Sequence, residues 1–379
     1  MYRVTRGTHG GRRMRGAISK RVYRSLGAIT AFVGLTTIGV GGVASASTQS
    51  PVSVNSAAAS LLTHPYRHGV VPMLGQTALQ LPACSTKCVV YGGGIDSVGV
   101  STGQEKVYLI FAGSQWGTES TNSSGYKTFS GDPVGMAPDL QAFFSGLGSS
   151  TDTWSGTMTT YCQGVSKGAA FCPTSAAHVA YPTGGALAGV WEDTAKASPA
   201  QSTAHEIAME AVRAAKHFGN TTLAANRNAQ YVIVSPHGTN PDNYKNAGFC
   251  AWHDYTRDTT LDGGGAVGGP PVAFTNLPYL TDVGSSCGAG FVNPGNVLDG
   301  VTIVEGHEYA ETVTDMAPVY GWISPSGEEV GDLCAWITTG SGKAQNITLS
   351  TGSFAVQSVW ANVANNNTGG CIIGHATVS

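Results

Sequence analysis

Two short apolar runs in the middle of the chain carry its clearest hydrophobic pattern. Residues 106–112 and 230–235 are rich in valine, isoleucine and aromatic side chains, and they end at Gly113 and Pro236. An unbroken apolar run of this length that stops at a turn is typical of a strand buried on both faces. We expect both runs to be core strands that deliver their following loops to one edge of a sheet.

Two other segments have the period of a helix. Residues 136–147 place Leu140, Phe143 and Leu147 on one stripe. Residues 198–218 open with Ser-Pro-Ala-Gln, which is a capping box with proline at the first helical position, and they stop before a glycine. Both segments are predicted to be amphipathic helices.

The final third is expected to contain a strand, a helix and closing strands. Residues 301–304 are all β-branched and predict a strand that leads into a helix over residues 305–315. Residues 345–349 and 354–359 alternate like strands. Because only 11% of residues are charged while glycine is abundant, turns and β-structure are favoured over a helical bundle. The predicted fold class is α+β or mixed α/β, with a central β-sheet and a few flanking helices, loop-rich and disulfide-stapled.

The N-terminal region has the pattern of a secretory signal peptide. A basic stretch leads into the apolar residues 26–43, and a small-residue exit ends at Ala46. This order predicts a signal peptide over residues 1–46, which implies a secreted chain with no membrane span once it is cleaved. Residues 47–82 are expected to form a low-complexity linker or pro-like segment, and residues 83–379 a single globular domain.

Removal of the signal peptide would change the charge. The full chain has 20 Lys and Arg against 23 Asp and Glu, a formal net charge of −3. Residues 1–46 hold eight of the basic residues and none of the acidic ones, so 12 basic residues remain against 23 acidic ones, a net charge near −11. Such a chain offers no basic surface for nucleic acid or anionic lipid. The expected partners are extracellular peptides, proteins or cell-wall components.

All eight cysteines lie in the predicted exported part. An even number of cysteines in an oxidising compartment predicts four disulfides. Spacing alone does not fix the pairing, although chain order suggests neighbours along the sequence. The suggested pairs are Cys84–Cys88, Cys162–Cys172, Cys250–Cys287 and Cys334–Cys371.

The segment His307-Glu308-x-x-Glu311 is the strongest candidate for chemistry. A helix puts His307 and Glu311 on one face, four residues apart, so both can bind one metal ion. In zinc peptidases with an H-E-x-x-H helix, the intervening glutamate takes a proton from the metal-bound water, and Glu308 would have that role here. The second histidine of that motif is replaced by Glu311, whose extra negative charge weakens the peptidase interpretation.

A third metal ligand is expected from the short segment that precedes Cys334. Glu329 and Asp332 are the candidates, because a glycine- and proline-containing loop could turn the chain back and a disulfide at Cys334 would hold it. Asp315, one turn beyond Glu311, is a reserve candidate.

Other chemistry has weaker support in the sequence. His205-Glu206 has methionine at the fourth position after the histidine and predicts an ordinary helix surface. His253 is more simply a histidine that bonds to backbone than a pocket residue. The pattern G-x-S-x-G occurs at three serines, but none has the strand-then-helix setting of a nucleophile elbow. These serines are Ser101, Ser166 and Ser286.

Several segments together resemble a group of secreted bacterial proteins that look like distant relatives of the plant EXORDIUM, or phosphate-induced, proteins. The resemblance covers roughly residues 84–379 and is most specific at the His-Glu-x-x-Glu segment and at Gly331-Asp-Leu-Cys334. It implies an extracellular, cell-wall-associated protein. The other segments that carry it are Val107–Ile110, Gln230–Gly238, Gly248–Tyr255, Asp299-Gly300 and Thr314-Asp315.

Two functions remain open from the sequence. The first is a secreted zinc-metallopeptidase-like hydrolase in which His307, Glu311 and either Glu329 or Asp332 bind zinc and Glu308 activates water. The second is a non-catalytic extracellular binding protein in which the same carboxylates hold calcium or form a buried network. Calcium favours an all-oxygen shell and would leave His307 without a ligand role.

Overall fold

The computed structural model describes residues 64–75, 88–95, 98–149 and 151–379. The chain divides into two units, residues 1–52 and 53–379, and all described residues belong to the second. The expected signal peptide and Cys84 lie outside the described residues, as does most of the expected linker.

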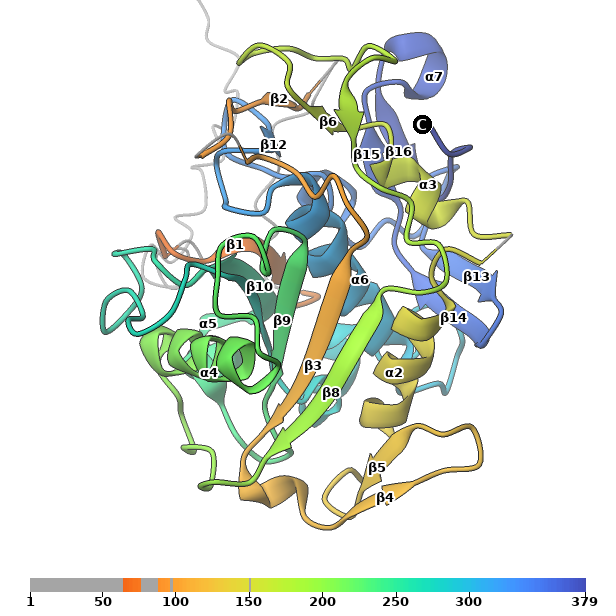
Figure 1. Ribbon diagram of the computed structural model, residues 1–379. Helices are drawn as coiled ribbons and strands as arrows, with labels where there is room; N and C mark the ends of the chain where they lie inside the picture. Colours follow the sequence, from red (N-terminus) through yellow and green to blue (C-terminus); the bar gives the residue numbers. More distant parts are fainter. Residues whose placement is uncertain (1–63, 76–87, 96–97, 150) are drawn as a thin grey trace, which may run out of the picture. The chain divides into compact units, whose positions relative to one another are not determined.

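A six-stranded sheet forms the centre of the second unit, in the order β1-β10-β11-β9-β3-β8 (Figure 1). β11, β9, β3 and β8 pair in parallel, whereas β10 is antiparallel to both β1 and β11. The mixed α/β class with a central sheet is confirmed. The strands are β1 (His68–Pro72), β3 (Lys106–Ala112), β8 (Leu187–Asp193), β9 (Ala229–Val234), β10 (Phe249–Tyr255) and β11 (Ala273–Leu277).

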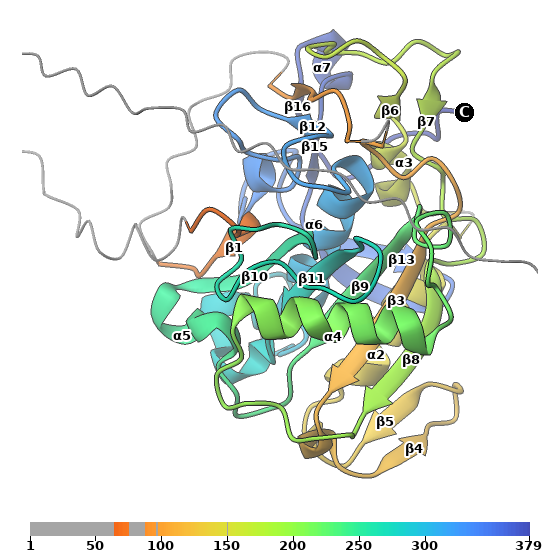
Figure 2. The same ribbon diagram turned by 60° about the vertical axis from the view of Figure 1, so that its left-hand side comes forward.

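The two predicted core strands are β3 and β9, and they pair with each other. Six of the seven residues of β3 and all six of β9 are buried. Helix α4 (Ala204–His217) covers one face of the sheet, while α2 (Met136–Gly146) and α6 (Asp299–Thr314) lie against the other (Figures 1 and 2). Because both faces are covered, the central strands need apolar side chains on both sides, which is the unbroken pattern that their sequence shows.

Smaller elements surround this core. A hairpin of β13 (Gln345–Leu349) and β14 (Gly352–Val356) packs on α6, and Thr302 Oγ1 donates to Ala355 O at 2.6 Å. Four further two-stranded pairs are β2 (Val90–Tyr91) with β12 (Trp322–Ile323), β4 (Glu119–Thr121) with β5 (Lys127–Phe129), β6 (Cys162–Gln163) with β7 (Ala177–His178), and β15 (Val359–Ala361) with β16 (Gly370–Ile372). The short helices are α3 (Trp154–Met158), α5 (Tyr244–Ala247) and α7 (Ala364–Asn367).

Residues 301–304 are helical, so the strand predicted there is wrong. They form the first turns of α6, in which every residue from Asp299 to Thr314 is buried. The sheet lies on one side of α6 and the β13–β14 hairpin on another, so the helix has no polar face toward solvent. Its sequence therefore lacks the periodic alternation of apolar and polar residues by which a surface helix is recognised. Packing on all sides outweighs the weak helix propensity of β-branched residues.

Helix α4 begins later than its sequence predicts. Thr203, not Ser198, is the N-cap: its side chain accepts from Glu206 N at 3.2 Å, and Thr203 N donates to Glu206 Oε2 at 2.9 Å. A capping box is thus present, displaced by five residues from the Ser-Pro-Ala-Gln sequence. Ser198 instead lies in the loop, where Gln115 bonds its backbone.

The segment expected as a linker contributes to the sheet. Strand β1 comes from residues 47–82, and it pairs with β10 through His68 opposite His253 and Val71 opposite Ala251. Trp336 Nε1 also donates to Pro72 O at 2.7 Å. The order of this segment depends on partners far along the chain, which its Ser- and Pro-rich composition does not reveal.

Three of the suggested disulfides are present: Cys162–Cys172, Cys250–Cys287 and Cys334–Cys371. The fourth suggested pair, Cys84–Cys88, includes a residue outside the described ranges. Disulfides fit a protein that folds in an oxidising compartment. None of the described helices has the length and apolar character needed to cross a membrane.

A substitution at the observed cap tests where α4 begins. Thr203→Ala should lower the free energy of unfolding by about 1 kcal/mol, because it removes the side-chain acceptor of the first turn. Ser198→Ala should leave this free energy unchanged. Urea denaturation followed by circular dichroism measures both, and a loss confined to Ser198→Ala would place the cap at the earlier position.

A thiol titration tests the cysteines. The denatured, unreduced protein should contain no free thiol, because its eight cysteines would form four disulfides. Two free thiols that map to Cys84 and Cys88 would limit the protein to the three bridges described above.

Candidate metal centre

Helix α6 carries the His-Glu-x-x-Glu segment into the interior of the protein. His307, Glu308 and Glu311 have no exposed surface. His307 Nε2 lies 3.0 Å from Glu311 Oε2, as expected for residues four apart on one helical face. A buried histidine and two buried carboxyl groups on one helix are costly unless they are paired or bind a cation.

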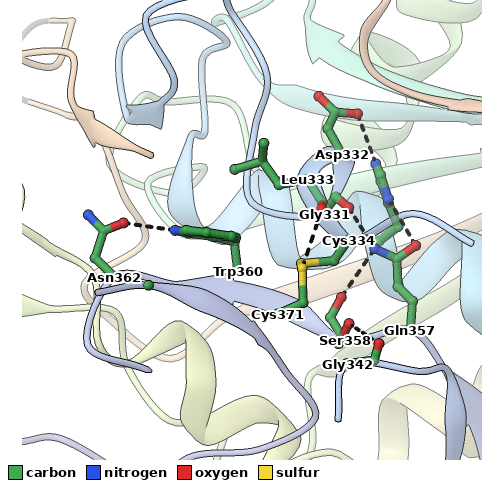
Figure 3. Close-up of a disulfide and its surroundings, with 12 residues drawn as sticks. Gly331, Asp332, Leu333, Cys334, Gly342, Gln357, Ser358, Trp360, Asn362 and Cys371 are labelled. Atoms are coloured by element: carbon green, nitrogen blue, oxygen red, sulfur yellow. Dashed lines mark hydrogen bonds and ion pairs between the residues drawn. A yellow bond between two sulfur atoms is a disulfide. The ribbon is translucent and has the colours of Figure 1, made fainter. Parts of the chain in front are cut away.

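The loop after β12 brings two more carboxyl groups to this helix. Asp332 begins the short helix η5 (Asp332–Cys334), and its Oδ1 lies 3.6 Å from His307 Nε2. The Cys334–Cys371 disulfide fixes this segment to β16, and Figure 3 shows it beside Gly331 and Asp332. The expected disulfide support for the loop is therefore present.

The ligand atoms of His307, Glu311 and Asp332 all lie within 4.8 Å of one another. Two ligands at the usual zinc distances in a tetrahedral shell are roughly 3.3 Å apart. The separations of 3.0 and 3.6 Å from His307 Nε2 to the two carboxylates bracket this value. These three side chains could thus hold a small divalent metal with little rearrangement.

A second group shares Glu311. His253 on β10 and Glu329 in the loop have ligand atoms within 4.8 Å of one another and of Glu311. His253 Nε2 lies 2.6 Å from Glu329 Oε2 and 3.6 Å from Glu311 Oε2. The structure therefore places Asp332 with His307 and places Glu329 with His253, while Glu311 Oε2 faces both histidines.

Gln357, which follows β14, orients His307. Its Oε1 lies 3.2 Å from His307 Nδ1, and its Nε2 donates to Gly331 O at 2.8 Å (Figure 3). Since the amide oxygen can only accept, the proton of a neutral His307 is on Nδ1 and the lone pair of Nε2 faces the carboxylates. Metal-binding histidines commonly have this arrangement.

Two glycines let the backbone approach the cluster. Gly331 N and Asp332 N donate to Glu311 Oε1 at 3.0 and 2.9 Å. A Cβ at Gly331 would lie 2.8 Å from His307 Nδ1, and a Cβ at Gly69 on β1 would lie 1.9 Å from Glu311 Oε2. β1 therefore covers the cluster only because Gly69 has no side chain.

The electrostatics favour an ion pair between His307 and Glu311. Burial alone would lower the pKa of His307, but the nearby Glu311 carboxylate, assisted by Asp332, raises it to about 9. Burial acts to raise the pKa of Glu311, yet the His307 imidazolium and the backbone donor at Asp332 hold it below its usual value. Glu311 is therefore the ionised carboxylate of the metal-free cluster.

The other carboxyl groups of the metal-free protein retain their protons to a higher pH than exposed carboxyl groups do. Burial and then Glu311 raise the pKa of Asp332 to about 7 and raise the pKa values of Glu308 and Glu329 well above their usual range. Burial lowers the pKa of His253 to about 3, so a neutral His253 accepts a hydrogen bond from the protonated Glu329. A divalent cation would replace these protons as the balancing charge.

Glu308 differs from the ligand candidates because both of its carboxyl oxygens lack a hydrogen-bond partner within the described part of the chain. Asp315, the reserve ligand, has a structural role instead: it accepts from Val319 N at 2.8 Å and from Gly321 N at 2.6 Å. Glu206, in the other His-Glu pair, is exposed on α4. Of the three G-x-S-x-G serines, Ser286 is in a 3-10 helix and the others are in loops.

The sequence interpretation missed two members of this site. His253 is part of the cluster and does not bond to backbone in a loop, because the segment around it is strand β10 and is buried. Its signal is a His-Asp pair directly after the apolar run Phe-Cys-Ala-Trp, where a buried polar pair needs a partner. Gln357 has a similar signal, because it is a polar amide within the closing strand that the sequence predicts over residues 354–359.

A comparison of the chain with protein-family models, with curated proteins and with solved structures found no match. The resemblance to the EXORDIUM proteins therefore stays a prediction.

Asp332→Asn tests the electrostatics of the metal-free cluster. Between pH 4 and pH 7 the unfolded chain releases the Asp332 proton while the folded protein retains it, so ionisation makes folding less favourable as the pH rises. The variant should thus be more stable than the chelator-treated wild type at pH 8, by at most roughly 4 kcal/mol, and by less at pH 5.

Urea denaturation at the two pH values measures this difference, with the exposed Asp262→Asn as the control. An equal difference at pH 5 and pH 8 would contradict the buried position of the Asp332 carboxyl group.

Proposed function

We propose that this protein is a secreted zinc-dependent hydrolase of peptide bonds. His307, Glu311 and Asp332 hold the metal, and Glu308 acts as the general base. The observation that carries the proposal is the convergence of one imidazole nitrogen and two carboxylate oxygens at separations that suit zinc, next to a buried carboxyl group without a hydrogen-bond partner.

The donor set supports zinc over calcium. Calcium takes six to eight oxygen ligands at roughly 2.3–2.6 Å, whereas zinc accepts nitrogen and few ligands. Two imidazole rings face Glu311 Oε2: His307 Nε2 lies at 3.0 Å and His253 Nε2 at 3.6 Å. An ion bound to Glu311 Oε2 and Asp332 would meet the His307 nitrogen, which an all-oxygen calcium site would exclude.

The residues around the metal have separate roles in the proposed reaction. Bound zinc would lower the pKa of a coordinated water. Glu308, adjacent to a ligand on α6 and without a hydrogen-bond partner, would accept the proton of that water. Its raised pKa, caused by burial and then by Glu311 and Glu305, makes it a stronger base than an exposed glutamate. Gln357 keeps His307 oriented, and Gly331 N and Asp332 N hold Glu311.

A peptide substrate would approach from the side of Asp332. The Asp332 side chain is 14% exposed, whereas the side chains of His307, Glu311 and Glu329 are at most 2% exposed. Peptide hydrolysis also needs movement of the loop around Asp332 or of β1, because Gly69 covers the opposite side.

Burial also favours a second candidate function. A site with so little exposure suits a structural ion in a non-catalytic extracellular protein, such as an EXORDIUM-like protein associated with the cell wall. In that case the metal, zinc or calcium, would stabilise the fold, and Glu308 would stay protonated. Both functions agree with secretion, which the predicted signal peptide and the three disulfides support.

Two variants separate these functions. Glu308→Gln should keep the zinc and lose peptide hydrolysis by a factor of about 100 or more, because the base is removed and the ligands stay. His307→Ala should lose both zinc and hydrolysis. Plasma mass spectrometry of the purified secreted protein measures the metal, and cleavage of a fluorescent peptide library measures the activity.

Glu206→Gln is the matched control, because it also follows a histidine on a helix but is exposed. Full zinc content in His307→Ala would refute the ligand assignment. Zinc that is lost in His307→Ala, with no cleavage in the wild type, would favour the structural ion.

A further inference from the structure

A second cluster of ionisable side chains lies beside the first but shares no residue with it. His68 comes from β1, Asp254 from β10, and Asp258 from the loop that follows β10. One ligand atom of each lies within 4.8 Å of those of the other two. The cluster joins the sequence expected as a linker to the centre of the sheet.

Asp254 is the buried member of this cluster. It has no exposed surface, its Oδ1 accepts from Tyr255 N at 2.7 Å, and its Oδ2 has no hydrogen-bond partner within the described residues. A buried carboxyl oxygen without a partner is costly, and the cost is removed when the oxygen binds a proton or a cation.

Asp258 is held in place beside it. Thr260 donates to both of its oxygens, from the backbone to Oδ1 at 2.7 Å and from Oγ1 to Oδ2 at 2.8 Å. Within the described ranges, neither aspartate forms an ion pair with a lysine or an arginine, and the nearest basic group is His68, whose Nε2 lies 4.0 Å from Asp258 Oδ2. Burial and Asp258 together raise the pKa of Asp254 well above its usual value. Two carboxyl groups thus face each other without a compensating cation.

We propose that His68, Asp254 and Asp258 form a second binding site, for a divalent transition metal of the zinc type. One imidazole nitrogen and two carboxylates are ligands that zinc and its neighbours accept, whereas a calcium shell would exclude the imidazole. The oxygen of Asp254 that lacks a partner would become a ligand. Thr260 would orient Asp258, as groups behind metal ligands commonly do.

The second site can be reached from solvent. The side chains of His68 and Asp258 are 22% and 12% exposed, whereas those of His307 and Glu311 are not exposed. An ion can thus enter without displacement of β1. Water can occupy the remaining coordination positions on the exposed side.

The position of His68 gives the site a mechanical role. His68 pairs with His253 across the β1–β10 ladder, and the next residue is Gly69, which covers Glu311. A metal bound to His68 and to two residues of the β10 segment would fasten β1 over the first cluster. The second ion would therefore bind β1 to the sheet, in addition to the few hydrogen bonds of the ladder.

Zinc titration of the chelator-treated, full-length secreted protein tests this site. Isothermal titration calorimetry and native mass spectrometry should find two zinc ions in the wild type and one in Asp258→Asn. His68→Gln, at a partly exposed position on an edge strand, is the second variant and should also bind one. Asp262→Asn, an exposed aspartate of the same loop, should bind two. Near-ultraviolet circular dichroism checks that each variant is folded.

The outcomes at the two sites are separable. One zinc in the wild type that is lost in Asp258→Asn, but not in His307→Ala, would support the second site and refute the proposed peptidase centre. Folded Asp258→Asn and His68→Gln that both bind as much zinc as the wild type would overturn the second site, whatever the result for His307→Ala.

Discussion

The structure depends on the burial of ionisable side chains along helix α6. Glu305, His307, Glu308 and Glu311 all lie within a helix whose sixteen residues are buried. Each charge there must be paired, neutralised by a proton, or balanced by a cation. For His307 and Glu311 the surrounding elements supply the partners: His253 from the sheet, Asp332 from the loop after β12, and Gln357 from the turn between β14 and β15. The fold around α6 is thus arranged as much for electrostatic compensation as for apolar packing.

That arrangement requires segments far apart in the sequence to stay in register. The Cys334–Cys371 disulfide and the Gln357–Gly331 hydrogen bond fix the loop that carries Asp332, while Cys250–Cys287 fixes the beginning of β10, three residues before His253. Backbone donors at Gly331 and Asp332 hold Glu311 from the other side. The raised pKa values of Glu308, Glu329 and Asp332 reduce the stability of the metal-free protein at neutral pH, and a scaffold that is cross-linked nearby can bear this cost.

The sequence predicted those parts of the molecule whose environment is local. Strands β3 and β9 were predicted because each is an unbroken apolar run that stays buried on both faces. Helix α2 was predicted because its buried residues recur with the helical period. The first turns of α6 were not, because a helix surrounded by protein loses the polar stripe that marks its period. The His307–Glu311 pair was predicted because both residues lie on one helix. The parts played by His253, Gly69 and Gln357 depend on contacts between residues far apart in the chain: a local pattern can mark His253 and Gln357 as polar residues in apolar segments, but it does not identify their partners.

The distribution of the candidate ligands along the chain has a consequence for when the metal can bind. The first cluster draws its proposed ligands from residues 307, 311 and 332, and the segment that covers it lies near residue 69. The centre is incomplete until residue 332 has been synthesised and translocated, because Asp332 is the last of these residues along the chain. If the chain is exported unfolded, it leaves the cell without metal. If the centre holds zinc as proposed, that ion would then be taken from the surrounding medium, and the zinc supply there would set the fraction of exported molecules that carry metal.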